Sequence, residues 1–328
     1  MKFPIRLIPD DTHIPFMRLR NVNFTISGIL SVLSIILFVF IGPDYGIDFR
    51  GGTIIEMKPV SQQIDLASIR STVTSLGLGD VQVTEVSDAD GATSVLIRIQ
   101  QQEGGEEAQQ AAITKVRDAF GDSMEFRRVE IVGPRVSSEL AFNGTLGMIV
   151  ALTGILIYIW FRFEWQFAVG AIVSTLHDLV MTLGFFALFK LEFNLASIAA
   201  LLTIVGYSLN DTVVVYDRIR ETLRKYKKMP LPELLDRAIN ETLSRTTITS
   251  LTTLIALLAL YLFGGEVISD FVLAMMFGVL IGTYSSIFIA APVLILFKLR
   301  PGQVAGVDKD EAEAEKAATA ATQPVNFG

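Results

Sequence analysis

Ionisable residues inside two apolar stretches are the feature of this sequence that points most directly to chemistry. Asn210 and Asp211 interrupt the apolar run 195–216, and Arg245 lies just inside the run 244–263. A charged side chain at the centre of a bilayer costs at least about 2.5–3.5 kcal/mol to insert. Such residues are retained where a proton or another ion has to cross, so these positions indicate a site of ion transfer.

Depth in the membrane favours a meeting of Asp211 with Arg245. Counted from the edge marked by Asp217, Asp211 lies about five residues inside the apolar region and Arg245 about two or three, a difference of a few ångströms at about 1.5 Å per residue. Neighbouring antiparallel helices would bring the two side chains together, and Thr249 lies one turn beyond Arg245 on the same face. Two simpler interpretations remain open, namely a static salt bridge and an arginine that extends to the lipid headgroups.

A second polar pair, His177 and Asp178, lies in the apolar run 166–189, nearer the middle of the bilayer. Histidine titrates near neutral pH and therefore suits a proton relay, whereas a hydrogen bond between helices is the simpler interpretation. The chain has 2 histidines and no cysteine, and the other histidine, His13, precedes the first apolar run. We therefore expect no disulfide, no metal site and no cofactor.

The apolar residues occur in runs near the length that crosses a bilayer core, about 20 residues. Hydrophobic residues make up 51% of the chain, and the mean hydropathy is +0.50. The first run is interpreted as an uncleaved anchor, because it is long and no small-residue cleavage site follows it. The runs predict membrane-spanning helices at 22–41, 140–161, 166–189, 195–216, 244–263 and 271–297.

Lysine and arginine beside the runs predict the orientation of the chain. Four lie in the first 21 residues and eight from Arg218 to Arg245 inclusive, whereas the connection 264–270 has none. Both termini are therefore predicted to face the cytoplasm. The expected order is a cytoplasmic arm 1–21, a first helix 22–42, an outside domain 43–139, helices two to six within 140–300 with a cytoplasmic loop 217–243, and a disordered cytoplasmic tail 301–328.

The outside segment has the pattern of a small α+β domain. Period-two alternation predicts strands at 81–87, 93–100 and 124–132, after a first strand at 52–59. Helical spacing of apolar residues predicts helices at 65–76 and 106–120. This β-α-β-β-α-β order is the split βαβ arrangement of ferredoxin-like domains. The predicted fold class is a polytopic α-helical membrane protein with six membrane helices and an extracytoplasmic ferredoxin-like domain.

The segment GIDFRGG connects the first apolar run to this domain. Its glycines allow sharp turns, so Gly46, Asp48, Gly51 and Gly52 are interpreted as a rigid junction or hinge. A phosphate-binding loop is the alternative, but no Lys-Ser or Lys-Thr follows the glycines.

Small residues recur every fourth position along the last apolar run. Small faces let helices approach closely in lipid, where packing and hydrogen bonds replace the hydrophobic effect. The pattern predicts helix packing along Ala274, Gly278, Gly282, Ser286 and Ala290.

Several motifs together resemble the SecD/SecF family of bacterial Sec translocase subunits. They are GIDFRGGT after the first run, HD in the third, GYSLNDTVVVYDRIRE in the fourth, and SRTTITSLTT and LYLFGGEVISDF after it. The resemblance covers nearly the whole chain and implies membership of the resistance-nodulation-division superfamily. Complete units of that superfamily have twelve helices in two related halves, so this chain would be one half and SecD the other.

The resemblance also implies an activity, which is non-enzymatic. With SecD, such a subunit uses the proton-motive force to assist polypeptide translocation across the bacterial inner membrane, after SecA and SecYEG have acted. Implied partners are SecD, SecYEG, SecA indirectly, YajC, YidC and the translocating polypeptide, with no nucleic acid. Asp211 and Arg245 match the acid and the arginine implicated in proton conduction. The candidate relay residues are Asp211, Arg245, Asn210, His177, Asp178 and Thr249.

Two other functions are compatible with parts of the sequence. Efflux pumps of the same superfamily usually carry both halves and far larger outside domains on one chain. A passive assembly scaffold would tolerate loss of charge at Asp211 and Arg245, whereas a proton-driven machine would not. An enzyme is not predicted, because the sequence has no nucleophile–base pair, zinc motif or Walker loop.

Overall fold

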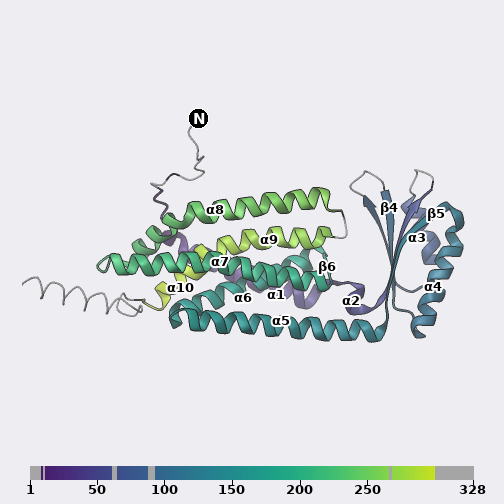
Figure 1. Ribbon diagram of the computed structural model, residues 1–328, viewed down its shortest axis with the longest axis horizontal. Helices are drawn as coiled ribbons and strands as arrows, with labels where there is room; N and C mark the ends of the chain where they lie inside the picture. Colours follow the sequence, from purple (N-terminus) through teal and green to yellow (C-terminus); the bar gives the residue numbers. More distant parts are fainter. Residues whose placement is uncertain (1–8, 10–11, 61–64, 88–92, 266–267, 300–328) are drawn as a thin grey trace, which may run out of the picture.

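The computed structural model describes residues 9, 12–60, 65–87, 93–265 and 268–299, so the predicted tail 301–328 lies outside the described residues. The molecule is elongated, with a helix bundle at one end and an α/β domain at the other (Figure 1). Six helices of the described part are long and apolar enough to cross a membrane, which confirms the predicted number. Their bounds are Phe16–Ile41, Pro134–Arg162, Trp165–Phe189, Leu195–Lys225, Leu231–Phe263 and Ser269–Leu296.

Three helices form the centre of the bundle and three lie around it. The apolar windows of the central helices are 50% to 61% buried, and those of the outer helices 6% to 11%. The central helices are α6 (Trp165–Phe189), α7 (Leu195–Lys225) and α9 (Ser269–Ser285). The outer helices are α1 (Arg20–Ile36), α5 (Pro134–Arg162) and α8 (Leu231–Phe263).

The last membrane helix is not continuous. Between α9 and α10 (Ala291–Leu296), residues Ser286–Ala290 form the π-helical segment η5. The wider π-helical turn shifts the helical faces, so residues beyond Ser286 leave the four-residue stripe that the sequence predicts. A similar segment, η2 (Leu37–Ile41), ends the first span, and the 3-10 turn η1 (Phe16–Leu19) begins it.

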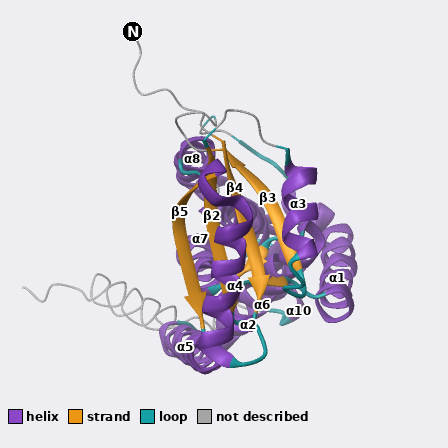
Figure 2. Ribbon diagram, turned by 90° about the vertical axis from the view of Figure 1, so that its right-hand side faces the viewer, coloured by secondary structure: helices purple, strands orange, loops and turns teal. Residues whose placement is uncertain are grey.

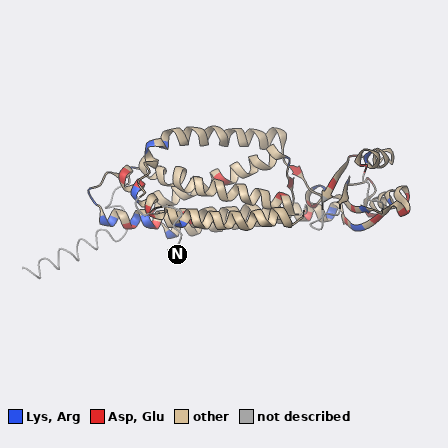
Figure 3. Cartoon of the chain, turned by 90° about the horizontal axis from the view of Figure 1, so that it is seen from above, with Lys and Arg blue, Asp and Glu red and all other residues tan. Residues whose placement is uncertain are grey.

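The predicted loop 217–243 is mostly helical, because α7 continues to Lys225 and α8 begins at Leu231. Each extension has an apolar face. Ile219 on α7 and Leu235 and Ile239 on α8 are almost fully buried in one cluster. Burial of these faces stabilises both extensions beyond the apolar region. Lysine and arginine gather at this end of the bundle, opposite the α/β domain (Figure 3).

The α/β domain contains one antiparallel sheet with strand order β3-β4-β2-β5. Helices α3 (Leu66–Ser75) and α4 (Gly105–Phe120) cover the face of the sheet that points away from the bundle (Figure 2). The order of elements is the predicted β-α-β-β-α-β, which is consistent with a ferredoxin-like domain. The core between sheet and helices contains the fully buried Ile55, Val95, Ile97 and Val116. The strands are β2 (Gly52–Pro59), β3 (Val81–Ser87), β4 (Thr93–Gln100) and β5 (Met124–Val132), preceded by the short turn η3 (Gly121–Ser123).

The GIDFRGG junction contacts the connection between α6 and α7. A short parallel pair joins β1 (Asp44–Tyr45) to β6 (Glu192–Phe193) in that connection. The single helical turn α2 (Ile47–Arg50) follows β1, and Asp48 Oδ2 accepts a hydrogen bond of 3.0 Å from the amide of Leu195. Asp48 thereby satisfies a free amide at the start of α7.

Glycine is required at two junction positions, Gly51 and Gly52, and packs closely at a third, Gly46. Gly51 and Gly52 have φ of 72° and 134°, which side chains of L-residues rarely adopt. A Cβ at Gly52 would lie 2.5 Å from the carbonyl oxygen of Ile99, and one at Gly46 would lie 2.5 Å from Glu192 Oε1. The junction therefore holds the first strand of the sheet close to the end of the bundle.

We expect the isolated segment 43–136 to fold as a soluble domain, because its two helices and four strands close a core without the bundle. Within this fragment, Ile97→Ala should lower the free energy of unfolding by about 2–5 kcal/mol, since Ile97 is fully buried. Lys115→Ala on the exposed face of α4 is the control and should change it little. Circular dichroism and amide exchange would show whether the fragment folds, and urea unfolding would measure the free energies of unfolding of the variants. A fragment without protected amides would show that the domain needs the bundle.

Candidate functional site

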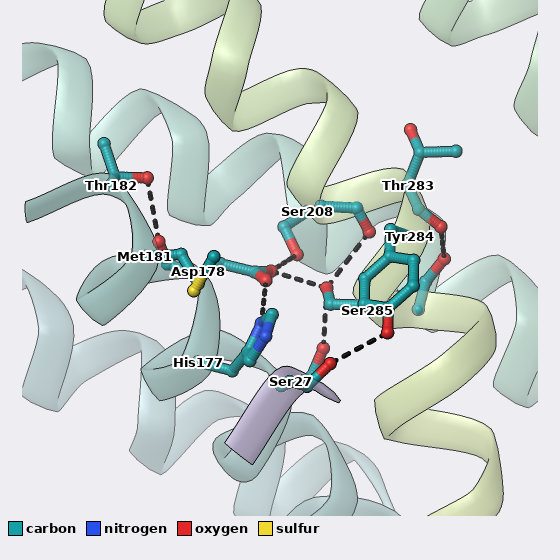
Figure 4. Close-up of polar contacts among 12 residues, drawn as sticks. Ser27, His177, Asp178, Met181, Thr182, Ser208, Thr283, Tyr284 and Ser285 are labelled. Carbon is teal, nitrogen blue, oxygen red and sulfur yellow. Dashed lines mark hydrogen bonds and ion pairs between the residues drawn. The ribbon is translucent and has the colours of Figure 1, made fainter. Parts of the chain in front are cut away.

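A buried carboxylate joins the three central helices. Asp178 on α6 is fully buried, and its Oδ2 accepts hydrogen bonds from Ser208 on α7 at 2.5 Å and from Ser285 on α9 at 2.7 Å (Figure 4). In the apolar interior of a bundle such bonds replace water as partners of the carboxylate. The three helices therefore share one polar centre.

The neighbouring His177 extends this centre toward α1. Its Nδ1 lies 2.9 Å from Asp178 Oδ1, and its side chain is 7% exposed. The imidazole ring lies beside the ring of Tyr284, with 6.3 Å between centroids. The Tyr284 hydroxyl is in turn 2.8 Å from Ser27 Oγ on α1 (Figure 4). The sequence alternatives for His177 were a proton relay and a hydrogen bond between helices, whereas its bond in the structure is to the adjacent Asp178 on its own helix.

The polar centre is a chain of groups with exchangeable protons. Ser174 Oγ donates to Ser285 Oγ at 3.0 Å, and Ser285 donates to Asp178, which also accepts from Ser208. Hydroxyl groups donate and accept at once, so such a chain can hold a proton and pass it on. Within the described part of the chain, no group of three or more His, Cys, Asp or Glu residues is placed to hold a metal ion.

Asp211 lies one helical turn beyond Ser208 on α7, in a different environment. Its side chain is buried, with the residue 2% exposed, and its Oδ2 has no hydrogen-bond partner among the described residues. A buried carboxylate oxygen without a partner is unfavourable, above all in the ionised form. Asp178 and Asp211 are therefore one satisfied and one unsatisfied carboxylate on neighbouring central helices.

Arg245 lies on α8, beside α7, and is close enough to interact electrostatically with Asp211. The ion pairs formed by the described residues nevertheless include none between these two side chains. The face of α8 explains this difference from the expected contact. Thr242, Thr246 and Ser250 point inward and are buried, whereas Arg245 is exposed at the bundle surface.

In the described part of the chain, neither of the two remaining candidates hydrogen-bonds to Asp178 or Asp211. Asn210 is exposed, and Thr249 donates to the carbonyl oxygen of Arg245 on its own helix at 2.9 Å. Ser208 and Ser285 were not among the candidates, although both bind Asp178. Ser208 stands within the GYSLND motif, three residues before Asp211, and that spacing was the available signal.

The small residues of α9 make the polar centre possible. A Cβ at Gly278 would lie 2.4 Å from Ile204 Cγ1, and one at Gly282 would lie 2.8 Å from Ser208 Cβ. Glycine at both positions lets α9 approach α7 closely enough for Ser285 and Ser208 to share one carboxylate. Ser286, the third predicted packing residue, is buried and donates to the carbonyl oxygen of Thr283 on its own helix.

Two protein families match this sequence. Residues 112–300 match the family described as protein export membrane protein SecD/SecF, C-terminal. Residues 36–61, which include the GIDFRGG junction, match the SecD/SecF GG motif. The matched regions thus cover the helix bundle from α5 onward and the junction.

Curated relatives extend this similarity along most of the chain. A protein translocase subunit SecF of Cereibacter sphaeroides is 45% identical over 302 residues, which are 90% of this chain and 93% of the relative. A protein translocase subunit SecDF of Brucella abortus is 48% identical over 309 residues, which are 94% of this chain. Only 40% of the SecDF relative is covered, so this chain spans less than half of it.

Solved structures show the same relation. A crystal structure of SecDF, described as a translocon-associated membrane protein from Thermus thermophilus, has a TM-score of 0.78 and 34% identity. The similarity covers 90% of this chain and 40% of that one. A SecDF structure in a super-membrane-facing form has a TM-score of 0.66, with 33% identity, over 97% of this chain and 41% of that one.

Gly282→Val should lower the stability of the bundle by about 1–3 kcal/mol, because the added side chain meets Ser208 and separates α9 from α7. Gly147→Val on α5 is the matched control, since a Cβ there meets nothing within 4 Å. Thermal unfolding of both variants in lipid nanodiscs would compare them. Equal unfolding temperatures would show that the close approach of α9 and α7 contributes little to stability.

Proposed function

This chain belongs to the SecD/SecF family of protein export membrane proteins, and we propose that it acts as one half of a proton-driven unit for polypeptide translocation. The other half is a SecD chain. The longer SecDF relative contains a further part that this chain does not match, and a separate SecD chain would correspond to that part. In this function SecA and SecYEG move the polypeptide first, and the unit of SecD and this chain acts after them. YajC and YidC are further proposed partners of this unit.

The observation that carries this proposal is the unpartnered oxygen of Asp211. Ionised, this buried carboxylate is costly to keep in an apolar bundle, and protonation removes most of that cost. Asp211 is therefore the proposed proton carrier. A proton that crosses a potential of about 100 mV releases about 2.3 kcal/mol, which is enough to shift an equilibrium between two arrangements of the helices.

The Asp178 cluster is the proposed element that responds to this proton. Ser208 donates to Asp178 and lies one turn from Asp211 on the same helix, so a movement of α7 changes both carboxylates. A buried, fully bonded network has few intermediate arrangements, because a broken hydrogen bond there is not replaced by water. Loading and unloading of Asp211 would thereby alter the packing of α6, α7 and α9.

Arg245 has a proposed role at the boundary with the second half. It is exposed in this chain alone, yet it acts electrostatically on Asp211. A permanently charged guanidinium beside a carboxylate favours the ionised form and thus the release of a proton. In the complete unit the second half would cover Arg245, and the lower dielectric would strengthen this influence.

The proposed orientation places both termini in the cytoplasm and the α/β domain outside the inner membrane. Lysine and arginine at the bundle end opposite the α/β domain support it (Figure 3). A proton would then move from the side of the α/β domain toward the basic end. Movement of the bundle would act on the domain that faces the emerging polypeptide.

Asp211→Asn should abolish the support of protein export, because an amide cannot carry a proton, while insertion and assembly stay normal. Asp217→Asn is the matched control, since Asp217 lies on the same helix, is exposed and pairs with Arg162 near the basic end. Export of a secreted reporter, in cells that lack the native subunit, is the measurement. Normal export with Asp211→Asn at normal expression would favour a passive scaffold and contradict the proton-carrier role.

A second prediction concerns Arg245 and compares lysine with methionine at this position. Arg245→Met should stop proton flux, because it removes the charge that favours release from Asp211. Arg245→Lys should impair flux in part, since a lysine loses its proton more readily when it is desolvated. Flux into inverted vesicles after a pH step, with the SecD half present, is the measurement. Arg237→Met is the control, because Arg237 is an exposed residue of α8 that pairs with Glu241. Equal proton flux with arginine, lysine or methionine at position 245 would contradict this role. It would favour the simpler interpretation, in which Arg245 extends to the lipid headgroups.

A further inference from the structure

An ion pair between described residues crosses from the sheet of the α/β domain to the helix bundle. Arg98 on β4 pairs with Glu192 on β6, in the connection between α6 and α7. Alternation along β4 directs Val95 and Ile97 into the core of the domain and Arg98 to the opposite face, toward the bundle. Both partners are largely buried, with the side chain of Arg98 27% exposed and that of Glu192 14%.

Three carboxylates lie near Glu192, in addition to Arg98. Asp270, in the first turn of α9, accepts a 2.7 Å hydrogen bond from the amide of Glu192, and Asp44 of β1 and Asp48 of α2 lie nearby. Burial raises the pKa of Glu192, the carboxylates of Asp270, Asp44 and Asp48 raise it further, and Arg98 lowers it. Arg98 is thus the group that offsets the charge of Glu192. We define the acidic cluster as Glu192, Asp270, Asp48 and Asp44.

The rest of this sheet face is separated from the bundle by a cavity of about 680 Å³. Leu96 and Val86 line it from the sheet, and Phe263 and Phe271 from the helices, so apolar groups here are only partly packed. Other charged groups also line it. Glu56 lies on β2, Arg128 and Glu130 lie on β5, and these last two pair with each other at 3.2 Å within one strand. Arg50 of α2 faces Asp44 at 3.9 Å.

The acidic cluster lies at the ends of the helices that form the buried polar centre. Glu192 follows α6 and precedes α7, and Asp270 begins α9. These three helices meet at Asp178 deeper in the bundle. A change in their packing therefore displaces the groups that Arg98 contacts, since helices transmit displacement along their axes as nearly rigid elements.

We propose that Arg98 is a positioning residue, which docks the α/β domain on the acidic cluster and transmits movement of α6, α7 and α9 to that domain. This inference assigns the mechanical contact, which the proposed function leaves open. Its test is a distance and not export, so it can fail while proton transfer stands, and it can hold if proton transfer fails.

The absence of cysteine in the chain makes the distance directly measurable. Cysteines introduced at the exposed Lys115 on α4 and Leu262 at the end of α8 would carry spin labels, on the full chain in nanodiscs. At neutral pH the parent should show one docked distance, and Arg98→Gln should add a second, longer population. Arg98→Lys, which keeps the charge, should retain the docked distance in most molecules.

Arg128→Gln is the matched control, because Arg128 lines the same cavity but pairs within its own strand. It should leave the distance unchanged. A distribution for Arg98→Gln equal to that of the parent at neutral pH would overturn the proposal. So would a release of equal size in Arg128→Gln, which would show a general effect of charge loss in the cavity.

Acidification supplies a second readout, and its sign follows from the raised pKa of Glu192. Glu192 binds a proton more tightly in the docked state than in a released state, in which its side chain is exposed. Protonation of Glu192 therefore favours docking at a pH below the ordinary carboxyl pKa. Docking weakens as the pH rises through the raised pKa of Glu192. Without Arg98 nothing offsets this effect. The longer population of Arg98→Gln should therefore shrink toward about pH 4. A release that persists at that pH contradicts docking on carboxylates.

Discussion

The close approach of α9 to α7 is the constraint on which the helix bundle depends. Gly278 and Gly282 leave no room for a side chain against Ile204 and Ser208. Because the two helices touch there, Ser285 and Ser208 can both reach Asp178. In lipid the hydrophobic effect does not drive helices together, so packing of small residues and shared hydrogen bonds must do so. The polar centre is thus both a product of the packing and a part of what maintains it.

The two buried carboxylates of the bundle suit different tasks because their surroundings differ. Asp178 accepts hydrogen bonds from α7 and α9 and lies 2.9 Å from Nδ1 of its neighbour His177, so both of its oxygens have fixed polar partners. Asp211 has a buried oxygen without a donor, so its charged form is supported only from a distance by Arg245. A satisfied group preserves a structure, whereas an unsatisfied one gains most from a change of protonation. This difference supports the proposal that Asp211 exchanges the proton and that the Asp178 cluster responds to it.

The α/β domain is attached to the bundle through polar contacts and through aromatic packing, in which Phe49 of the junction stacks on Phe193 at 5.8 Å. The pair β1–β6, the bond from Leu195 to Asp48 and the ion pair Arg98–Glu192 all lie at the connection between α6 and α7 or beside it. A cavity separates the remaining sheet face from the helices. Polar contacts beside a cavity can rearrange at less cost than a packed apolar interface, because water can replace the lost partners. The ion pair Arg98–Glu192, which borders the cavity, is therefore the part of the attachment suited to movement.

The sequence by itself determined the helices, the strands and the family. Apolar runs of membrane length and period-two alternation are local patterns, so the six spans and the strands β2 to β5 follow from them directly. Amphipathic extensions such as 231–243 were missed, because only burial against α7 shows that their apolar faces are used. The tertiary structure alone decided which polar groups meet. The sequence places Asp211 and Arg245 at similar depth, but their side chains do not face each other. Thr246, and not Arg245, is the buried residue on this face of α8. Ser285 reaches Asp178, 107 residues away in sequence, because two glycines bring the helices together. Arg98 meets Glu192 because one face of the sheet points toward the end of the bundle that carries the connection between α6 and α7.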